Sequence, residues 1–359
     1  MHDCKPIAKR NMKRILSSAA IAAALGAGGF AGCTSQNAAD VNEIFPAVED
    51  VRWEVLSDDL EIFGAQDMSV DDRYVYVLGK PVGGEVMIFE KAHPEKAPHI
   101  MVRRGQGPGE VVNASGVERG KDPGEFLVFD VETGKMLRAN TVADSVYQEA
   151  VFALPRNVLS GRRIRCLGQD RYLVQGNDLR TQPLSGRYFI VSGDTIECRY
   201  DNYPLDEDLW DLQLLHGHLA VSPDGRNFAT GNVFGGLVEF FHINDTSITA
   251  TVAVDLFPTL VSKQGWVYKP DDNALVGFVS MTADDQSVYG AFYGTPMDSI
   301  TAGHIAQWDW SGKPVRLFNT DKRIHQIAVD PTESHTIYGI ISDEDKAGEQ
   351  SIKLAKIVL

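Results

Sequence analysis

Cysteine is scarce in this sequence, with only 4 residues among 359, so disulfide bonds are not its main source of stability. A chain of this length can bury an ample apolar core without them. The composition, 43% hydrophobic and 23% charged, also excludes a disordered tail. Basic residues are in deficit, since 34 lysines and arginines face 49 acidic residues and leave a net charge of -15. No basic stripe opposes this charge, so no nucleic-acid partner is expected.

Several signatures of catalysis and of helical structure are missing. The sequence contains no Gly-x-Ser-x-Gly elbow of a serine hydrolase and no Asp-x-Asp-x-Asp-Gly calcium loop. Beyond the N-terminal region, no segment repeats apolar residues with helical periodicity over three turns. The sequence therefore assigns no catalytic residue, no metal ligand and no cofactor, and it predicts an all-β chain.

The first 32 residues have the pattern of a secretory signal peptide. Lys13 and Arg14 precede an apolar run of small residues, Ile15–Phe30, and small residues precede Cys33. The run is short for a membrane span, and translation is predicted to start at Met12.

The end of this run resembles the bacterial lipobox, which implies that Cys33 is lipidated and becomes the first mature residue. Phe30 stands where the lipobox usually has Leu, and the alternative is a signal peptide that ends at a cysteine by coincidence. Residues 33–50 are polar at their start and without periodicity, so we expect a flexible tether. Thr34 matches lipoproteins sent to the outer membrane. Asp40 is the one acid among residues 34–40, and this scarcity of acids after Cys33 favours a periplasm-facing anchor over the cell surface.

From residue 51 onward the sequence repeats a pattern of strand, acidic turn and strand. Short apolar segments bounded by Gly, Pro, Asn or Asp predict strands throughout. The turns recur roughly every 50 residues, at Asp71–Asp72, Lys121–Gly124, Gln169–Asp170, Pro223–Gly225, Asp284–Asp285 and Asp330–Pro331. Six such units of four strands predict a six-bladed β-propeller of four-stranded antiparallel blades over residues 51–359.

The chain ends predict how the ring closes. The last unit supplies only three strands, at His325–Val329, Thr336–Ile341 and Ser351–Val358, while Val51–Leu56 is a lone strand at the start. An unpaired strand edge invites aggregation, so we expect the N-terminal strand to complete the last blade.

The chain resembles a known family at two places. Arg103–Glu110 contains Gly105-Gln-Gly107-Pro-Gly109-Glu110, and His304–Val315 is followed by Ile327–Asp330. Both are similar to segments of the TolB-like six-bladed propeller lipoproteins of Bacteroides-type bacteria. This resemblance implies the fold and export, and the family has no settled activity.

The predicted topology gathers long loops on one face of the disc. Parallel inner strands place the acidic turns on one face, and the second-to-third-strand loops and inter-blade connections on the other. Long loops on a rigid scaffold concentrate binding groups, so the second face is the predicted site. Its candidates are arginines that suit carboxylates or sugar hydroxyls, one acid, and flat aromatic rings. They are Arg103, Arg104, Glu110, Arg180, Trp210, Phe234, Trp266, Tyr268 and Tyr293.

Structural roles compete with these assignments. Gly105, Gly107 and Gly109 can serve a strained connection in which Glu110 caps backbone amides, and the aromatic rings can belong to the core. A ring of aspartates at 71, 72, 224, 285 and 330 suggests a cation site, but Asp in a tight turn binds its own backbone, which we favour.

Two further pairs carry predictions. His216 and His218 lie on one face of a strand, but the sequence names no third metal ligand. Cys166 and Cys198 fall on the first and fourth strands of one blade, about 14 Å apart, so no disulfide is expected.

The sequence thus favours a lipid-anchored, periplasm-facing binding module over an enzyme. We expect it to bind a glycan, a peptide or a partner protein, to act as a monomer, and to contact the membrane only through its lipid. The alternative is a propeller hydrolase or lactonase with a divalent metal on the central axis. Its nearest candidate residues are Asn113, Glu118, Asn177 and Asn232.

Overall fold

The computed structural model describes residues 14–15, 41–58, 60–62, 64–153, 159–168, 170–178, 180, 186–202, 217–264, 267–344 and 350–359. Cys33, the predicted site of cleavage and lipidation, lies outside these residues, as do the candidates Trp210, Trp266 and His216. Within them, no helix is long and apolar enough to cross a membrane.

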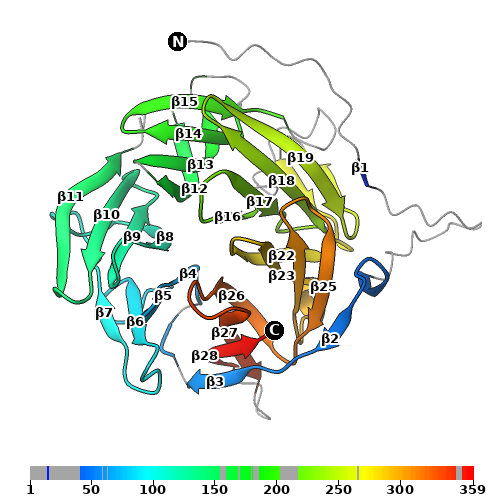
Figure 1. Cartoon of the computed structure of the whole chain (residues 1–359), viewed down its shortest axis with the longest axis horizontal. Helices are drawn as coiled ribbons and strands as arrows, with labels where there is room; N and C mark the ends of the chain where they lie inside the picture. The colour runs from blue at the N-terminus through cyan, green and yellow to red at the C-terminus, as the bar shows by residue number, and fades with distance from the viewer. Residues whose placement is uncertain are drawn as a thin grey trace, which may run out of the picture.

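Six antiparallel sheets of four strands form a ring, which confirms the predicted six-bladed propeller (Figure 1). We number the blades in chain order and give their strands from the axis outward. Blade 1 contains β4 Asp67–Val70, β5 Tyr74–Leu78, β6 Val86–Glu90 and β7 His99–Met101; blade 2 contains β8 Ala114–Arg119, β9 Glu125–Asp130, β10 Lys135–Asn140 and β11 Ser145–Ala153; blade 3 contains β12 Leu159–Gly168, β13 Arg171–Asp178, β14 Tyr188–Ser192 and β15 Thr195–Tyr200.

The second half of the ring repeats this arrangement. Blade 4 contains β16 His218–Val221, β17 Asn227–Gly231, β18 Leu237–Asn244 and β19 Ser247–Asp255; blade 5 contains β22 Val276–Ala283, β23 Ser287–Thr295, β24 His304–Asp309 and β25 Pro314–Asn319; blade 6 contains β26 Arg323–Val329, β27 Thr336–Glu344, β28 Gln350–Val358 and β3 Glu54–Ser57. Short elements outside the blades are β1 Arg14–Ile15 beside β19, η1 Val41–Glu43, β2 Val48–Asp50 and η4 Met297–Ser299.

The middle strands are buried on both faces because each blade packs against two neighbours. All residues of β9 are buried, whereas the outer strand β15 has mostly exposed or half-buried residues. Between blades 1 and 2, for example, Tyr76 and Ile88 pack against Phe126 and Val128. This packing explains why the middle strands read as continuous apolar runs.

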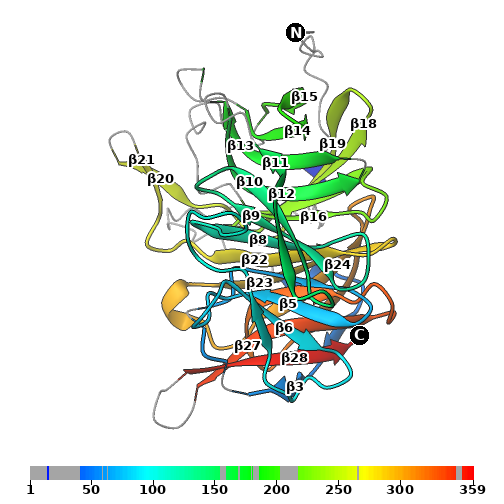
Figure 2. The same ribbon diagram turned by 90° about the vertical axis from the view of Figure 1, so that its left-hand side faces the viewer.

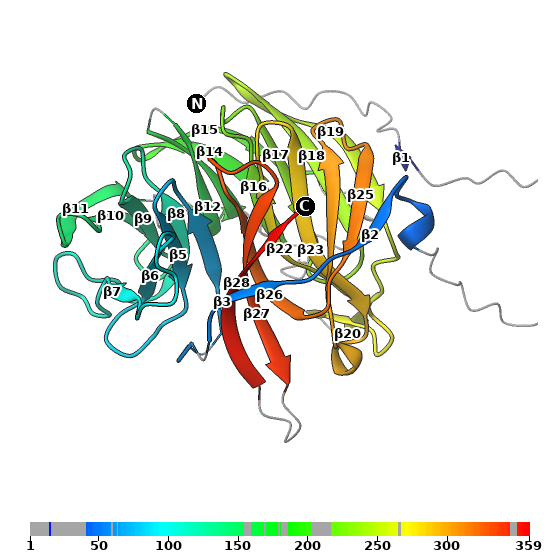
Figure 3. The ribbon, with the colours of Figure 1, turned by 60° about the horizontal axis from the view of Figure 1, so that its bottom comes forward.

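The N-terminal strand closes the ring, as predicted. β3 pairs with β28 in an antiparallel register, with Val55 opposite Ala355 (Figure 3). Trp53, just before β3, is 7% exposed and belongs to the cluster that contains Ile337 and Ile357.

Secondary structure begins before residue 51, where the sequence predicted the propeller to start. Residues 41–50, which were expected to be part of the tether, form η1 and β2, and β2 pairs in parallel with β25. Phe45 is 5% exposed and its ring lies 5.7 Å from that of Trp308. The apolar side chain of Phe45 anchors this segment on blade 5, so residues 41–50 belong to the folded body.

Neighbouring inner strands are linked by side chains at the spacing of the repeat. The Asp67 carboxylate accepts a hydrogen bond from Val117 N–H at 3.0 Å, 50 residues away. Glu118 accepts one from Cys166 N–H at 2.8 Å, 48 residues away. Ser280 accepts one from Ile327 N–H at 3.1 Å, 47 residues away. These bonds satisfy backbone donors on inner-strand edges that lack a further strand.

The acidic turns have the predicted structural role. Asp71 accepts hydrogen bonds from the backbone N–H groups of Arg73 and Tyr74 at 2.7 and 2.6 Å. Asp224 and Asp330 cap their own turns similarly. In blade 5 the prediction named the wrong neighbour, because Asp284 rather than Asp285 accepts from Gln286 and Ser287.

The connection from β19 to β22 contains a hairpin that the sequence analysis did not predict. β20 Val261–Gln264 pairs with β21 Val267–Pro270, and the hairpin projects from one face of the disc (Figure 2). The candidate Tyr268 lies on β21, and its side chain is outside the described residues. Cys166 on β12 and Cys198 on β15 lie on the first and fourth strands of blade 3, as predicted.

Candidate functional site

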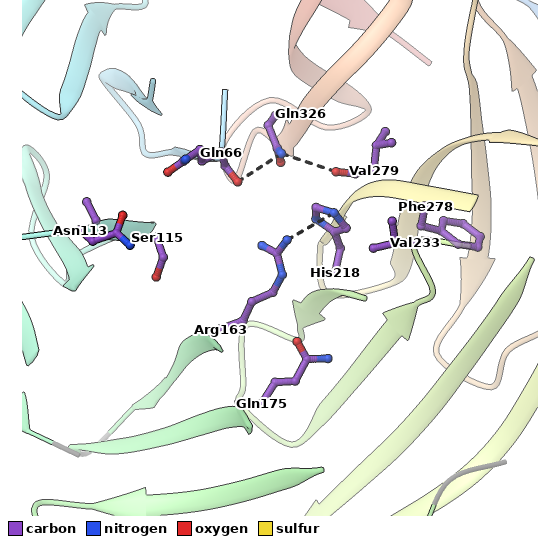
Figure 4. Close-up of a pocket in the computed structure, with 11 residues that line it drawn as sticks. Gln66, Asn113, Ser115, Arg163, Gln175, His218, Val233, Phe278, Val279 and Gln326 are labelled. Carbon is purple, nitrogen blue, oxygen red and sulfur yellow. Dashed lines mark hydrogen bonds between the residues drawn. The ribbon is translucent and has the colours of Figure 1, made fainter. Parts of the chain in front are cut away.

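A cavity of about 520 Å³ lies on the central axis, and all six blades contribute to its wall (Figure 4). Several of its residues precede or begin inner strands, where the long loops and inter-blade connections gather. The polar lining consists of Gln66, Asn113, Ser115, Arg163, Gln175, His218 and Gln326, and the apolar lining of Ala114, Val233, Phe278 and Val279. We call this cavity the axial pocket.

Arg163 on β12 and His218 at the start of β16 meet inside the axial pocket. Nη2 of the guanidinium lies 3.4 Å from Nε2 of the imidazole, and Figure 4 shows the pair. Burial, followed by the charges of Arg163 and Arg165, holds the pKa of His218 well below its ordinary value. His218 is therefore neutral at pH 7, and its ring nitrogen can accept from Arg163.

Arg163 is a cation without a carboxylate partner in the described part of the chain. Burial lowers its pKa to about 10, so it stays charged at neutral pH. Its neighbour Arg165 donates to both carboxylate oxygens of Asp67, each at 3.0 Å. The two arginines of one strand thus differ, because one is paired and the other faces the axial pocket.

Gln175 and Ser115 line the axial pocket and have no side-chain hydrogen-bond partner among the described residues. Gln175 on β13 is fully buried, and neither its Oε1 nor its Nε2 is bonded. The hydroxyl of Ser115 is likewise unbonded. A buried polar group without a partner is destabilising by about 1–3 kcal/mol, so these groups are suited to bonds with a bound molecule.

The remaining amides are held in place by the protein. Nε2 of Gln326 donates to the carbonyl of Gln66 at 3.2 Å. Lys80 donates from Nζ to Oδ1 of Asn113 at 3.1 Å. With the Gln66 carboxamide turned to satisfy both of its atoms, its oxygen accepts from the same Lys80 at 3.2 Å and its nitrogen donates to Ala114. Lys80 is therefore a second cation at the rim of the axial pocket.

The fit of the axial pocket to a metal ion is poor. No described residue that lines it is Asp or Glu. Over the whole described chain, no three His, Cys, Asp or Glu side chains are grouped as metal ligands would be.

The four residues named for a metal do not converge. Asn113 lines the pocket, while Glu118 accepts from Cys166 and burial raises its pKa to about 7. Asn177 donates to the carbonyl of Gly186 at 3.2 Å. Asn232 is fully buried, and neither of its amide atoms has a bond.

The glycine-rich segment Gly105–Gly109, which connects blade 1 to blade 2, has a structural role. Glu110 accepts a hydrogen bond from Gly107 N–H at 2.8 Å. A Cβ atom at Gly105 would lie 2.0 Å from the same carboxylate oxygen, so a larger residue there would displace the Glu110 side chain. Arg104 pairs through Nε with Glu85 at 3.2 Å, and Arg103 is exposed.

The other described candidates do not form one site. Arg180 makes two bonds to Asp178, at 2.9 and 2.6 Å. Phe234 is half-buried beside the pocket residue Val233. Tyr293 is 4% exposed and donates its hydroxyl to the Ile324 carbonyl, so its ring offers no face to a ligand.

Most residues of the axial pocket were not among the candidates predicted from sequence, although Asn113 and His218 were considered there as metal ligands. Arg163, Gln175, Gln66 and Gln326 lie on or beside strands that the analysis treated as scaffold. One signal was available, since Arg162-Arg163-Ile164-Arg165 is an unusual run of charge on an inner strand. Charged residues near a propeller axis are exposed to the central cavity, and that criterion would have found Arg163.

No protein-family model matches this chain, and no curated protein does. Among solved structures, a Bacteroides fragilis protein named as exported is similar over 89% of this chain and 96% of its own, with a TM-score of 0.53 and 10% identity. A member of the DUF4221 family from Bacteroides vulgatus is similar over 85% and 94%, with a TM-score of 0.51 and 8% identity. The calcium-binding protein regucalcin from Agrobacterium tumefaciens is similar over 87% and 96%, with a TM-score of 0.50 and 10% identity.

At these identities the similarity shows the fold alone. Fold and pocket together define the class of this chain as a six-bladed β-propeller with a polar pocket on its axis.

Proposed function

We propose that this protein is a binding module that takes a small polar ligand into the axial pocket, with the surrounding loop face extending the contact. The observation that carries the proposal is Gln175, whose buried amide has neither of its bonds in the protein. Because the wall comes from all six blades, the groups around it are rigidly positioned before any ligand arrives.

The anchor is part of the same proposal. Cleavage before Cys33 and lipidation of that residue would hold the propeller at the outer membrane, facing the periplasm. The net charge of -15 would keep the body away from anionic membrane surfaces. Metabolic labelling with a palmitate analogue tests this step, because Cys33→Ser should abolish the label and leave an unprocessed precursor.

A metal-dependent hydrolase is the competing class. The calcium-binding protein regucalcin is similar in fold, but the described lining of the axial pocket here has amides and an arginine and no carboxylate. A divalent ion prefers carboxylate oxygens, and a cationic guanidinium would repel it. Elemental analysis of the purified protein separates the classes, because one equivalent of a divalent ion would favour the hydrolase.

A plugged pocket tests the binding proposal directly. Val233→Trp places a large side chain in the axial pocket, and Val142→Trp places the same side chain at a position that is 65% exposed, outside the pocket lining. A library of sugars, peptides and small acids is screened by thermal shift against both variants. Ligands that stabilise the parent and Val142→Trp but not Val233→Trp support the proposal. Ligands that stabilise all three proteins equally would place the binding site elsewhere.

A further inference from the structure

The charge of the axial pocket is unbalanced in a way that selects its ligand. Arg163 faces the pocket, and no carboxylate of the described residues pairs with it, although its neighbour Arg165 has Asp67. A charge removed from water without a partner is destabilising, and an arginine fork fits a carboxylate with two hydrogen bonds. A bound anion would supply the partner that Arg163 lacks among the described residues.

We propose that the axial pocket binds a small carboxylic acid that also carries several hydroxyl groups, namely an acidic mono- or disaccharide. This inference rests on the proposed function and adds the chemical class of the ligand. Arg163 would bind the carboxylate, and the amides and hydroxyl of the wall would bind the sugar hydroxyls.

Lys80 adds a second positive charge at the rim. Its ammonium group is bonded to the neutral oxygens of Asn113 and Gln66, and it forms no ion pair with a described carboxylate. Glu85, whose carboxyl also senses the charge of Lys80, is already paired with Arg104 at 3.2 Å. The pocket thus presents two cations in a protein with a net charge of -15, which draws an anion to this position.

The neutral lining favours hydroxyl groups over amines. An amide both donates and accepts, as a hydroxyl does, and Gln175 and Ser115 have these capacities unused. An ammonium group would add a further positive charge beside Arg163 and Lys80, and the described lining contains no carboxylate to balance it. Amino acids and free peptide N-termini therefore fit less well than sugar acids.

Size and apolar contacts agree with this class. The volume of about 520 Å³ lies in the range of pockets that enclose small organic ligands. The half-buried Val233 and Val279 form an apolar part of the wall, which suits the C–H face of a sugar ring.

The test compares matched sugars by isothermal titration calorimetry. The probes are D-galacturonate, its disaccharide, the neutral methyl ester of D-galacturonate, D-galactose, D-galactose 6-phosphate and D-galactosamine. We expect the acids to bind about tenfold or more tightly than the ester and D-galactose, because only the acids pair with Arg163. Arg163→Gln should remove that preference, Lys80→Gln should weaken it, and Val142→Trp should leave it unchanged.

Each other result is decisive. Equal binding of acid, ester and galactose, blocked by Val233→Trp, would overturn the sugar-acid assignment and leave the proposed function standing. Preference for the phosphate or the amine would overturn it as well. If no probe binds, the ligand class is wrong, and the wider screen against Val233→Trp then decides the proposed function by itself. Thermal unfolding of Arg163→Gln and Lys80→Gln confirms that each variant is folded before it is titrated.

Discussion

The indole of Trp53 lies directly against Gly339 of β27, and a Cβ atom at the glycine would stand 2.5 Å from the ring carbon Cη2. Trp53 precedes the strand that closes blade 6, and Gly339 is in the second strand of that blade. The two ends of the propeller are therefore joined by a large apolar side chain in a position that only glycine leaves open.

Trp53→Ala is expected to weaken this closure strongly. Truncating a buried tryptophan is destabilising by about 3–5 kcal/mol, and Gly339→Val should lower stability by forcing the ring aside. Val55→Ala on β3 is the control, since Val55 is 38% exposed and should change stability by less than about 0.5 kcal/mol. Urea unfolding measures all three, and equal stability of Trp53→Ala and Val55→Ala would show that this contact does not hold the ring shut.

A buried ion pair joins blades 3 and 4. The side chains of Arg187 and Glu239 are 0% and 1% exposed, and a nitrogen of the guanidinium donates to Oε2 of the carboxylate. Glu239→Gln leaves the arginine charge buried without its counterion, so we expect a loss of about 3–5 kcal/mol.

The matched control is Glu197→Gln, because Glu197 pairs with Arg171 where both side chains are about 30% exposed. An exposed pair contributes less than about 1 kcal/mol. The double variant Arg187→Met with Glu239→Leu should recover most of the loss in urea unfolding. If Glu239→Gln and Glu197→Gln both lower stability by a similar small amount, the charge of Arg187 reaches solvent in the Glu239→Gln variant.

The closure was predictable from sequence because it follows from counting strands. The last repeat has three strands, and Trp53 lies beside the lone strand that supplies the fourth. The axial pocket was not predictable in the same way, because Gln66, Arg163 and Gln326 come together only when six inner strands converge. These residues are far apart in the sequence, and no local sequence pattern predicts that they line one pocket.

For the loop candidates, the sequence could not show which side chains are already bonded within the protein. Glu110 and Arg180 have the right chemistry, but each is satisfied by a neighbour in sequence, Gly107 N–H and Asp178 respectively. Residue type alone does not show whether a group is already bonded. Gln175 shows the converse, since an ordinary strand residue is left without either of its bonds.

Glu118 should make stability depend on pH between about 4.5 and 7. Burial raises the pKa of its carboxyl from 4.5 to about 7 in the folded protein, despite the opposing charge of Arg165. In that interval the folded state keeps a proton that the unfolded state has released, so the stabilising contribution of this group is present below pH 4.5 and lost as the pH rises to 7.

Glu118→Gln has no carboxyl proton to lose. The free energy of unfolding of the variant minus that of the parent should therefore be larger at pH 8 than at pH 5, by on the order of 1–3 kcal/mol. Glu95→Gln is the control, since the side chain of Glu95 is 66% exposed and its replacement should show no such trend. The measurement is urea unfolding at both pH values. A gap between Glu118→Gln and the parent that stays constant would mean that Glu118 is ionised throughout.

Gln175→Met tests whether the amide of Gln175 stabilises the free protein or is available to bind a ligand. The unbonded amide of Gln175 is destabilising in the free protein, so methionine of similar size should raise stability by about 1–2 kcal/mol and weaken ligand binding. Gln307→Met is the control, because the buried Gln307 donates to Ser287 Oγ at 2.9 Å and its loss should lower stability by about 1 kcal/mol. Opposite signs for the same substitution at two buried positions would show that Gln175 is held unsatisfied in the free protein. If both variants lose stability alike, an ordered water already completes the bonds of Gln175, and a ligand would have to displace that water to reach the amide.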